Sequence, residues 1–399
     1  MNIAVIFDNE NDGGGGFYQS LNTSTIIQKL NHKYNLTFIT TSKIDNKYLK
    51  KDDLFFIFYK KKKISKLYER IKKSNITSYL IKKIGFKNPF TVFLKKHKIE
   101  FVIFLGPSYL INLCDEINFS VNIWDTGHLF NNYYPEFKYN NSINAREEII
   151  NKSIKESFAI FVDSQKSKRN LIQYYNCFEK KIIIQPFIPY ISKPYAEFIK
   201  NKIDYTKILE SMNIDLSKKY FFYPAQFWSH KNHKYLLDVC KILNNKNIQI
   251  IFCGSDKGNL EYIKKYINKN NLDDFIKIFS FVDESQLISL YLGCSGLLIP
   301  TVVATSTLIF YEALFFEKKI FYSADVLDIN LENFVTTFDL KNPSDLADKI
   351  MLYLNNDEEN KTKKNGKEFF ISECSENKCE KKYDIMLTDF QYKSSFWKL

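Results

Sequence analysis

The stretch Leu297–Leu314, with the sequence Leu-Leu-Ile-Pro-Thr-Val-Val-Ala-Thr-Ser-Thr-Leu-Ile-Phe-Tyr-Glu-Ala-Leu, decides the fold. A short apolar run ends at Pro300, a polar loop follows, and an apolar helical pattern begins after Thr307. This order is typical of a buried strand that turns into a helix, which is the repeating unit of parallel α/β sheets. Free backbone amides and hydroxyls at such a helix start can bind an anion. The stretch therefore predicts an α/β fold with a ligand site at the end of this strand.

The same alternation of strand and helix extends in both directions from this stretch. Apolar, strand-like runs recur along the chain, each followed by a longer amphipathic segment. They lie near residues 2–7, 36–41, 54–59, 101–106, 120–125, 159–164, 182–187, 220–224, 248–255, 276–282, 296–301 and 319–323. Because β-then-α alternation builds parallel sheets with helices on both faces, we expect a Rossmann-like α/β architecture.

The alternation breaks near residues 188–218, where several prolines lead into a polar helical stretch. A chain of 399 residues is too long for one compact core. We therefore expect two Rossmann-like domains, an N-terminal one at 1–190 and a C-terminal one at 191–380, with a linker at the break. The amphipathic segment 381–399 ends in aromatic residues and should pack against the rest as a helix.

Composition places the chain among ordinary folded proteins, with 45% hydrophobic and 26% charged residues. Seven scattered cysteines without a CxxC pair indicate reduced thiols in a reducing compartment. The sequence opens directly on a strand-like run, and no stretch has the eighteen or so apolar residues of a membrane span. We expect a cytoplasmic protein.

The net charge of +12 is concentrated in residues 47–98, which hold 17 Lys and Arg against three acidic residues. The run Lys60–Lys63 and the helical pattern after it would suit an anionic membrane surface, which makes peripheral attachment to the inner face of the cytoplasmic membrane one reading. A solvated basic face is the other. Nucleic acid is not expected, because no zinc-finger, homeodomain or RNA-recognition pattern accompanies the charge.

Two further segments carry residues suited to binding phosphate. Asp12–Leu21 contains four consecutive glycines before a helix, which would let backbone N–H groups approach a phosphate, although a flexible surface loop is the alternative. Its spacing is not GxGxxG, which disfavours a dinucleotide oxidoreductase. In Tyr223–Leu237, Lys231 stands between a strand and a helix, where its charge could neutralise a diphosphate or simply cap and solvate the helix.

Glu312 interrupts an otherwise apolar helical pattern. A lone carboxylate there is costly unless it has a partner such as sugar hydroxyls, or unless it is a partly exposed glutamate. His230 and His233 are three residues apart with no third ligand nearby, so a zinc site is not expected.

Taken in order, several segments resemble the successive motifs of family four glycosyltransferases, and those of the first half resemble bacterial members that build lipopolysaccharide and capsule glycans. They are Trp124–His128 with Pro135–Phe137, Phe161–Ser164 with Lys168–Leu171, Tyr223–His233, Phe252–Ser255, Phe281–Leu287 with Leu290-Tyr291, and Pro300–Ala313. The likeness covers both domains. It implies the GT-B fold, in which two Rossmann-like domains face each other across a cleft and a C-terminal helix crosses back to the N-terminal domain.

The resemblance also implies roles for residues of the donor site. Lys231 matches the family lysine that touches the donor diphosphate, and Glu312 matches the second glutamate of a pair, which holds the donor ribose. The first glutamate of that pair is Ala304 here, and Gln226 stands where many members have an arginine. The remaining donor-binding residues implied by the resemblance are Gly15 and Gly16 near the phosphates, Phe281 and Val282 near the base, Gly254, and the backbone amides of Ser306, Thr307 and Leu308.

On the acceptor side, Asp125 matches a family aspartate, but the histidine that usually precedes it is Trp124 here. His128 is a candidate replacement, so either Asp125 or His128 is expected to orient an acceptor hydroxyl or the donor sugar, unless His128 is only a satisfied loop histidine. The family chemistry needs no protein nucleophile, because a phosphate oxygen of the leaving group takes the acceptor proton. No Asp-x-Asp occurs in the chain, which favours a metal-independent enzyme without a cofactor.

The sequence thus predicts a retaining glycosyltransferase that moves a hexose-type sugar from UDP or GDP to a lipid-linked surface glycan. Two alternatives stay open. One is a nucleotide-sugar 2-epimerase of the same fold, and the other is a catalytically silent nucleotide-sugar-binding subunit.

Overall fold

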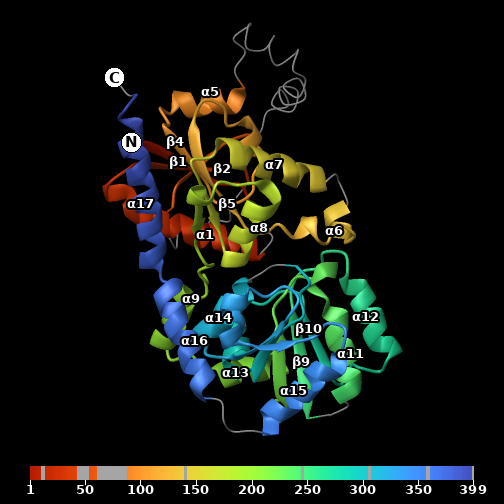
Figure 1. Ribbon diagram of the computed structural model, residues 1–399. Helices are drawn as coiled ribbons and strands as arrows, with labels where there is room; N and C mark the ends of the chain where they lie inside the picture. Colours follow the sequence, from red (N-terminus) through yellow and green to blue (C-terminus); the bar gives the residue numbers. More distant parts are fainter. Residues whose placement is uncertain are drawn as a thin grey trace.

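The computed structural model describes residues 1–9, 14–42, 54–60, 88–138, 142–243, 247–303, 307–355 and 360–397. The described chain forms two α/β domains stacked one on the other, each with its own parallel sheet (Figure 1). This is the arrangement that the sequence predicts, and it is the GT-B fold.

The N-terminal sheet has seven parallel strands in the order β3-β2-β1-β4-β5-β6-β7. The strands are β1 (Asn2–Phe7), β2 (Asn35–Thr40), β3 (Phe56–Phe58), β4 (Phe101–Phe104), β5 (Asn118–Ile123), β6 (Ala159–Val162) and β7 (Ile182–Ile184). Around them lie α1 (Gly15–Gln28), α5 (Pro89–Lys96), α6 (Pro135–Lys138), α7 (Ser142–Glu156) and α8 (Gln165–Tyr175). Strand order reverses between β1 and β4, and open α/β sheets bind ligands at such a point.

The C-terminal sheet has six parallel strands in the order β10-β9-β8-β11-β12-β13. The strands are β8 (Lys219–Tyr223), β9 (Ile248–Cys253), β10 (Ile276–Phe279), β11 (Gly296–Ile299), β12 (Lys319–Ser323) and β13 (Thr336–Phe338). Its helices are α9 (Ser192–Lys200), α10 (Tyr205–Ser211), α11 (His233–Leu243), α12 (Leu260–Lys269), α13 (Glu284–Gly293), α14 (Leu308–Phe315), α15 (Pro343–Asn355) and α16 (Asn360–Glu373). Here the strand order reverses between β8 and β11, so in both sheets the reversal lies between two central strands.

Nearly continuous apolar strands explain why helices cover both faces of each sheet. In β4, β6 and β11 every residue is buried. Parallel strands buried on both faces read in this way, because each face needs a layer of helices. The N-terminal sheet separates two apolar clusters, and a single large cluster fills the C-terminal domain.

The C-terminal helix α17 (Glu376–Ser394) crosses back to the N-terminal domain, where it lies beside α1 (Figure 1). Cys374 belongs to the C-terminal core, whereas Cys379 already belongs to the N-terminal core. The ring of Tyr383 stacks on Phe161 at 4.3 Å, and its hydroxyl donates to Oδ1 of Asn122 at 3.0 Å. The expected crossing helix is therefore confirmed, and its partner is the apolar face of the N-terminal sheet.

The structure corrects the sequence-based elements in two places. The segment expected as a linker is mostly folded, because Ile191, Phe198, Leu209 and Met212 are buried in the C-terminal core. Strand β13 was not predicted, since two of its three residues are threonines and no apolar run marks it. All seven cysteines are buried and unpaired. Over the described residues, no helix is both long and apolar enough to cross a bilayer.

Candidate active site

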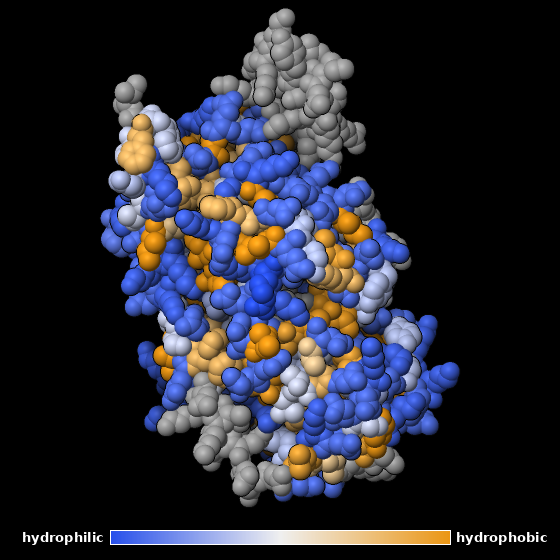
Figure 2. Space-filling model, in the orientation of Figure 1, coloured by the Kyte–Doolittle hydropathy of each residue, from blue (hydrophilic) through white to orange (hydrophobic). Residues whose placement is uncertain are grey.

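A cavity of about 450 Å³ lies between the two domains and is lined by residues of both. The N-terminal domain contributes the start of α1 and the end of β5, and the C-terminal domain contributes the loops after β8, β9, β10 and β11. In Figure 2 much of the surface is hydrophilic, while apolar residues gather along the middle of the molecule, where the domains meet. The volume suits a nucleotide-sized ligand.

Two helices begin at this cavity, one from each domain. A Cβ on Gly15, the first residue of α1, would lie 3.8 Å from Cδ2 of Leu308, the first residue of α14. Thr307 caps α14, since its hydroxyl accepts the N–H of Phe310 at 3.2 Å. Neither helix has an acidic residue in its first turn, so both positive dipole ends are available to an anion.

Lys231 ends the short 3₁₀ turn Ser229–Lys231, which joins β8 to α11, and it lines the same cavity. The hydroxyl of Tyr223 donates to its carbonyl oxygen at 2.9 Å and fixes the turn on the sheet. Burial lowers the pKa of Lys231 to about 8, although the negative charges of Asp125 and Glu136 oppose this effect. The cavity wall therefore holds a cation that is poorly compensated and suited to binding an anion.

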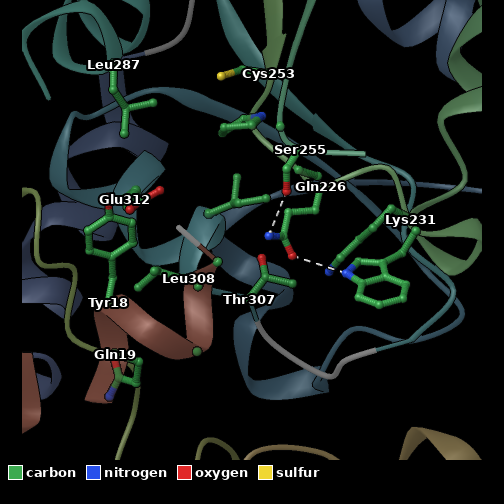
Figure 3. A pocket seen from close by; sticks show the side chains of 18 of the residues that line it. Tyr18, Gln19, Gln226, Lys231, Cys253, Ser255, Leu287, Thr307, Leu308 and Glu312 are labelled. Carbon is green, nitrogen blue, oxygen red and sulfur yellow. Dashed lines mark hydrogen bonds between the residues drawn. The ribbon is translucent and has the colours of Figure 1, made fainter. Parts of the chain in front are cut away.

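Glu312 lies on the opposite wall from Lys231, one turn into α14 (Figure 3). Its side chain is buried and accepts a hydrogen bond from the hydroxyl of Tyr291. Burial raises the pKa of Glu312 to about 7, against the smaller effect of the Tyr291 bond. Among the described residues no cation forms an ion pair with this carboxylate, so it remains an acceptor for a ligand's hydroxyl groups.

The remaining donor-side residues of the sequence analysis surround the same space. Nε2 of Gln226 donates to Ser255 at 3.1 Å, and its Oε1 accepts from Nε1 of Trp228 at 3.2 Å, so its orientation is fixed (Figure 3). A Cβ at Gly254 would lie 2.4 Å from the carbonyl oxygen of Ala225, which only glycine avoids. Phe281 lines the cavity and is 74% exposed. Gly16, Val282 and Thr307 also line the cavity.

The structure separates the two acceptor-side candidates. Asp125 lines the cavity, and its Oδ1 accepts from Arg146 at 3.2 Å and from the N–H of Gly127 at 2.9 Å. Burial opposes these contacts, yet they hold the pKa of Asp125 below its usual value.

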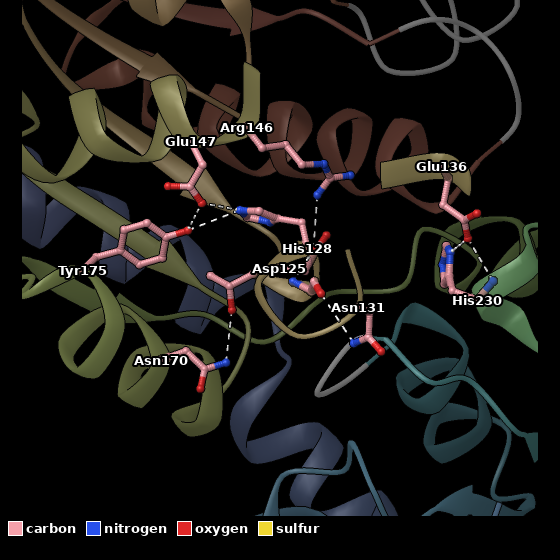
Figure 4. Close-up of polar contacts among 11 residues, drawn as sticks. Asp125, His128, Asn131, Glu136, Arg146, Glu147, Asn170, Tyr175 and His230 are labelled. Atoms are coloured by element: carbon pink, nitrogen blue, oxygen red, sulfur yellow. Dashed lines mark hydrogen bonds and ion pairs between the residues drawn. The ribbon is translucent and has the colours of Figure 1, made fainter. Parts of the chain in front are cut away.

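His128 does not line the cavity. Its Nε2 lies 2.7 Å from Glu147, and Tyr175 donates to the same carboxylate at 2.6 Å (Figure 4). His128 therefore belongs to a buried network behind the site.

Trp124, which precedes Asp125, has a packing role that the sequence did not reveal. The indole of Trp124 lies between two glycines: a Cβ at Gly16 would approach it to 2.7 Å, and a Cβ at Gly106 to 2.5 Å. Trp124 therefore fills the crevice between β1 and β4 and forms a wall of the cavity. Gly106 was not singled out, because it follows a strand with no glycine pattern around it.

Neither histidine of the Lys231 segment is free for a metal. His230 pairs with Glu136, and Nε2 of His233 lies 3.3 Å from the carbonyl oxygen of Ala225. Burial lowers the pKa of His233 to about 3, so this side chain is a neutral core residue. Among the described residues, no group of three or more His, Cys, Asp or Glu side chains is placed to hold a metal ion.

Several residues singled out from the sequence lie outside the described residues. They are Asp12, Gly13, Lys61–Lys63, Ala304 and Ser306, together with most of the basic stretch 47–98.

Residues 204–369 match the family described as glycosyl transferases group 1. A capsular polysaccharide biosynthesis glycosyltransferase, CapH of Staphylococcus aureus, is 29% identical over 212 residues, which cover 51% of this chain and 54% of that protein. The match thus spans about half the length of this relative.

Solved structures share the fold over both domains. A glycosyltransferase from Rickettsia africae has a TM-score of 0.69 at 16% identity, covering 96% of this chain and 97% of the other. Anabaena HepE in complex with UDP has a TM-score of 0.70 at 11% identity, covering 98% and 100%. At these identities the likeness concerns the fold alone.

Proposed function

We propose that this chain, a glycosyltransferase family four-like protein of the GT-B fold, is a retaining hexosyltransferase that uses a UDP- or GDP-linked donor. The acceptor is a hydroxyl group of a lipid-linked surface glycan. One observation carries the proposal: Lys231, the start of α14 and Glu312 line a single cavity between two sheets. These are the groups that a nucleoside diphosphate with a free ribose requires.

Each part of such a donor has a partner of matching chemistry. The diphosphate would meet Lys231 and the amides at the starts of α1 and α14, where two helix dipoles and a lysine favour negative charge. The ribose hydroxyls would donate to the carboxylate of Glu312. The base would lie near Phe281, Val282 and Gly254, whose loops border the far side of the cavity.

The chemistry we propose needs little from the protein beyond charge and position. As the bond from the sugar to the diphosphate breaks, negative charge grows on the leaving phosphate, where Lys231 and the helix starts stabilise it. A phosphate oxygen of the leaving group then takes the proton of the acceptor hydroxyl on the same face of the sugar, which preserves the anomeric configuration. Asp125 orients the acceptor from the N-terminal domain, and two domains that close on the substrates supply proximity. We propose that the reaction needs no metal ion.

The curated relative favours a role in surface polysaccharide synthesis, because CapH is described as a glycosyltransferase of capsular polysaccharide biosynthesis. HepE was solved with UDP, which makes UDP the first nucleotide to test. We further propose that the protein works in the cytoplasm at the inner face of the membrane, with the basic stretch 47–98 facing anionic lipid.

The test is a thermal-shift screen against UDP, GDP and a panel of their sugars, followed by product analysis with the stabilising donor. A raised melting temperature with one nucleotide and a new glycoside of unchanged anomeric configuration are expected. Release of UDP with an epimerised free sugar, without any acceptor, would instead identify an epimerase. Binding without hydrolysis or transfer, across acceptor extracts, would identify a silent binding subunit.

A further inference from the structure

The side chain of Glu136 connects the two domains beside the candidate active site. It lies in α6 of the N-terminal domain, and its side chain is only 8% exposed. Its Oε1 accepts the backbone N–H of His230 at 2.9 Å and also pairs with Nδ1 of the same residue (Figure 4). His230 belongs to the turn of the C-terminal domain that carries Lys231. Glu136 itself does not line the cavity.

Aromatic rings strengthen this contact from both domains. The imidazole of His230 is stacked on Phe137 of the N-terminal domain, at 6.0 Å and 26°, and on Trp228 of its own domain, at 6.4 Å and 21°. Arg146 lies over the ring of Phe137 at 5.1 Å and also bonds Asp125. The turn is therefore held by a continuous series of side chains that begins in the opposite domain.

The same turn is tied to both halves of the donor site. The carbonyl oxygen of His230 accepts the N–H of Val302 at 3.0 Å, in the segment that leads to the start of α14. The carbonyl oxygen of Lys231 is held by Tyr223. Displacing His230 would thus move Lys231 and Val302 together.

Burial opposes the charge of Glu136, yet its hydrogen bonds to His230 hold its pKa below the usual value, so the carboxylate is ionised at neutral pH. A buried carboxylate is costly unless its bonds are made, so Glu136 favours the arrangement in which the two domains touch.

We propose that Glu136 is a positioning residue: it holds the turn His230-Lys231 in place from the opposite domain, so that Lys231 faces the diphosphate when the domains meet. The inference rests on the proposed function, because it concerns the lysine of the donor site. It assigns Glu136 a part in the reaction without contact to the substrate. Glu136 stabilises the state in which the domains are in contact and the sugar is transferred. Losing it should therefore lower kcat more than it lowers the affinity for the nucleotide.

The chain offers a matched control at a second contact between the domains. Asp328 accepts from the N–H of Lys166 at 2.7 Å and from Arg169 at 3.2 Å. None of these three residues lines the cavity. Arg169→Ala removes an ion pair across the domain boundary without touching the donor site.

The experiment compares Glu136→Ala, Glu136→Gln and Arg169→Ala in the full chain. For Glu136→Ala we expect kcat with a UDP-sugar to fall about tenfold or more, while the Kd for UDP rises by a smaller factor. Glu136→Gln keeps the carbonyl acceptor for the N–H of His230 and should retain about a third or more of the activity. Arg169→Ala should behave like the wild type.

Amide hydrogen exchange gives a readout that does not need turnover. The backbone N–H of His230 should exchange faster in Glu136→Ala and stay protected in Glu136→Gln and Arg169→Ala. Unchanged exchange and kcat in Glu136→Ala would overturn the inference. So would a parallel loss of UDP affinity and melting temperature, which marks a purely structural role. If no donor is turned over by the wild type, the proposed function fails, and the exchange experiment still decides whether Glu136 holds the turn.

Discussion

Gly15 and Leu308 begin helices that belong to different domains, yet a Cβ added to Gly15 would lie only 3.8 Å from Cδ2 of Leu308. The positive ends of α1 and α14 therefore point into one cavity, and Lys231 adds a full charge to its wall. An anion with two phosphates would be stabilised by all three groups at once. The predictions below test this convergence.

Lys231 should make nucleotide binding depend on pH. Its pKa in the empty site is about 8, so the charge is present at neutral pH and is lost as pH rises above that value. We expect the affinity for UDP to be flat below pH 8 and to fall above it, while Lys231→Arg, which stays charged, should remove the decline. Titration calorimetry between pH 6.5 and 9.5 measures this effect.

At pH 7, Lys231→Ala should lower transfer by about tenfold or more, which corresponds to about 1.4 kcal/mol of transition-state stabilisation. Lys234, which pairs with Asp238 on the surface, is the matched control, and Lys234→Ala should leave transfer unchanged. Equal rates in both variants would remove Lys231 from the donor site.

The buried carboxylate of Glu312 should lower the stability of the fold while it contributes to donor binding. Its pKa is about 7 in the fold against 4.5 for an ordinary glutamate, so the folded state keeps a proton that the unfolded chain releases. The stability contributed by this group therefore falls as pH rises from about 4.5 to about 7 and stays low above it. Because glutamine does not titrate, Glu312→Gln should raise the melting temperature more at pH 8 than at pH 5.

The same substitution should weaken donor binding, and Glu312→Ala should lower transfer by about tenfold or more, because the ribose loses its acceptor. Glu332→Gln, at an exposed glutamate, is the control for the thermal measurement. A stability gain of equal size at pH 5 and pH 8 would show that Glu312 is not protonated in the fold.

Alanine substitutions at the neighbouring residues Gly15 and Gly16 should have very different effects on donor affinity. A methyl group at Gly15 meets Leu308 at an ordinary distance, whereas one at Gly16 would lie 2.7 Å from the indole of Trp124 and must displace it. We expect Gly16→Ala to lower UDP-sugar affinity several-fold more than Gly15→Ala, because the displaced ring changes the cavity wall. Gly106→Ala, which meets the same ring from the other side, should reproduce the Gly16 effect. Similar affinities in all three variants would contradict this role of Trp124.

Substitutions at Asp125 and at His128 should have different effects: the first should lower the rate of transfer, and the second should lower the stability of the fold. Asp125→Asn should lower transfer while leaving the Kd for UDP nearly unchanged, because the carboxylate faces the cavity from the acceptor side. His128→Ala removes a buried side chain and its contact with Glu147, which keeps its bond from Tyr175, and should cost about 1–3 kcal/mol of unfolding free energy. Its residual kcat per folded molecule should stay near that of the wild type. Loss of kcat at an unchanged melting temperature would instead place His128 in the reaction.

The basic run Lys60–Lys63 should bind anionic vesicles. Replacing its four lysines with glutamine is expected to weaken sedimentation with phosphatidylserine vesicles, and added salt should weaken binding of the wild type in the same way. Neutral phosphatidylcholine vesicles are the control. Sedimentation that is unchanged by the substitutions would favour a solvated basic face.

The architecture could be predicted from local patterns. The apolar runs match the strands from β1 to β12 within a few residues, because a strand covered on both faces must be apolar along its length. The break near residue 190 was also visible, but the burial of Ile191 and Phe198 was not, since a polar helix with one apolar side resembles a linker when its partner is unknown. Strand β13 was missed because two of its three residues are threonines, so that no apolar run marks it.

The sequence by itself determined the two α/β domains and the residue types of the candidate site, because strand periodicity, the glycine turn and a carboxylate in an apolar helix are local features. Only the tertiary structure decided which groups meet. It placed Lys231 and Glu312 on facing walls, turned His128 away from the cavity, and brought Glu136 from one domain to His230 of the other. These contacts join residues up to 94 positions apart. The first two arrangements depend on the order of the strands within each domain. The third depends on how the two separately folded domains pack against each other, which is set by surface shape and charge rather than by any pattern along the chain.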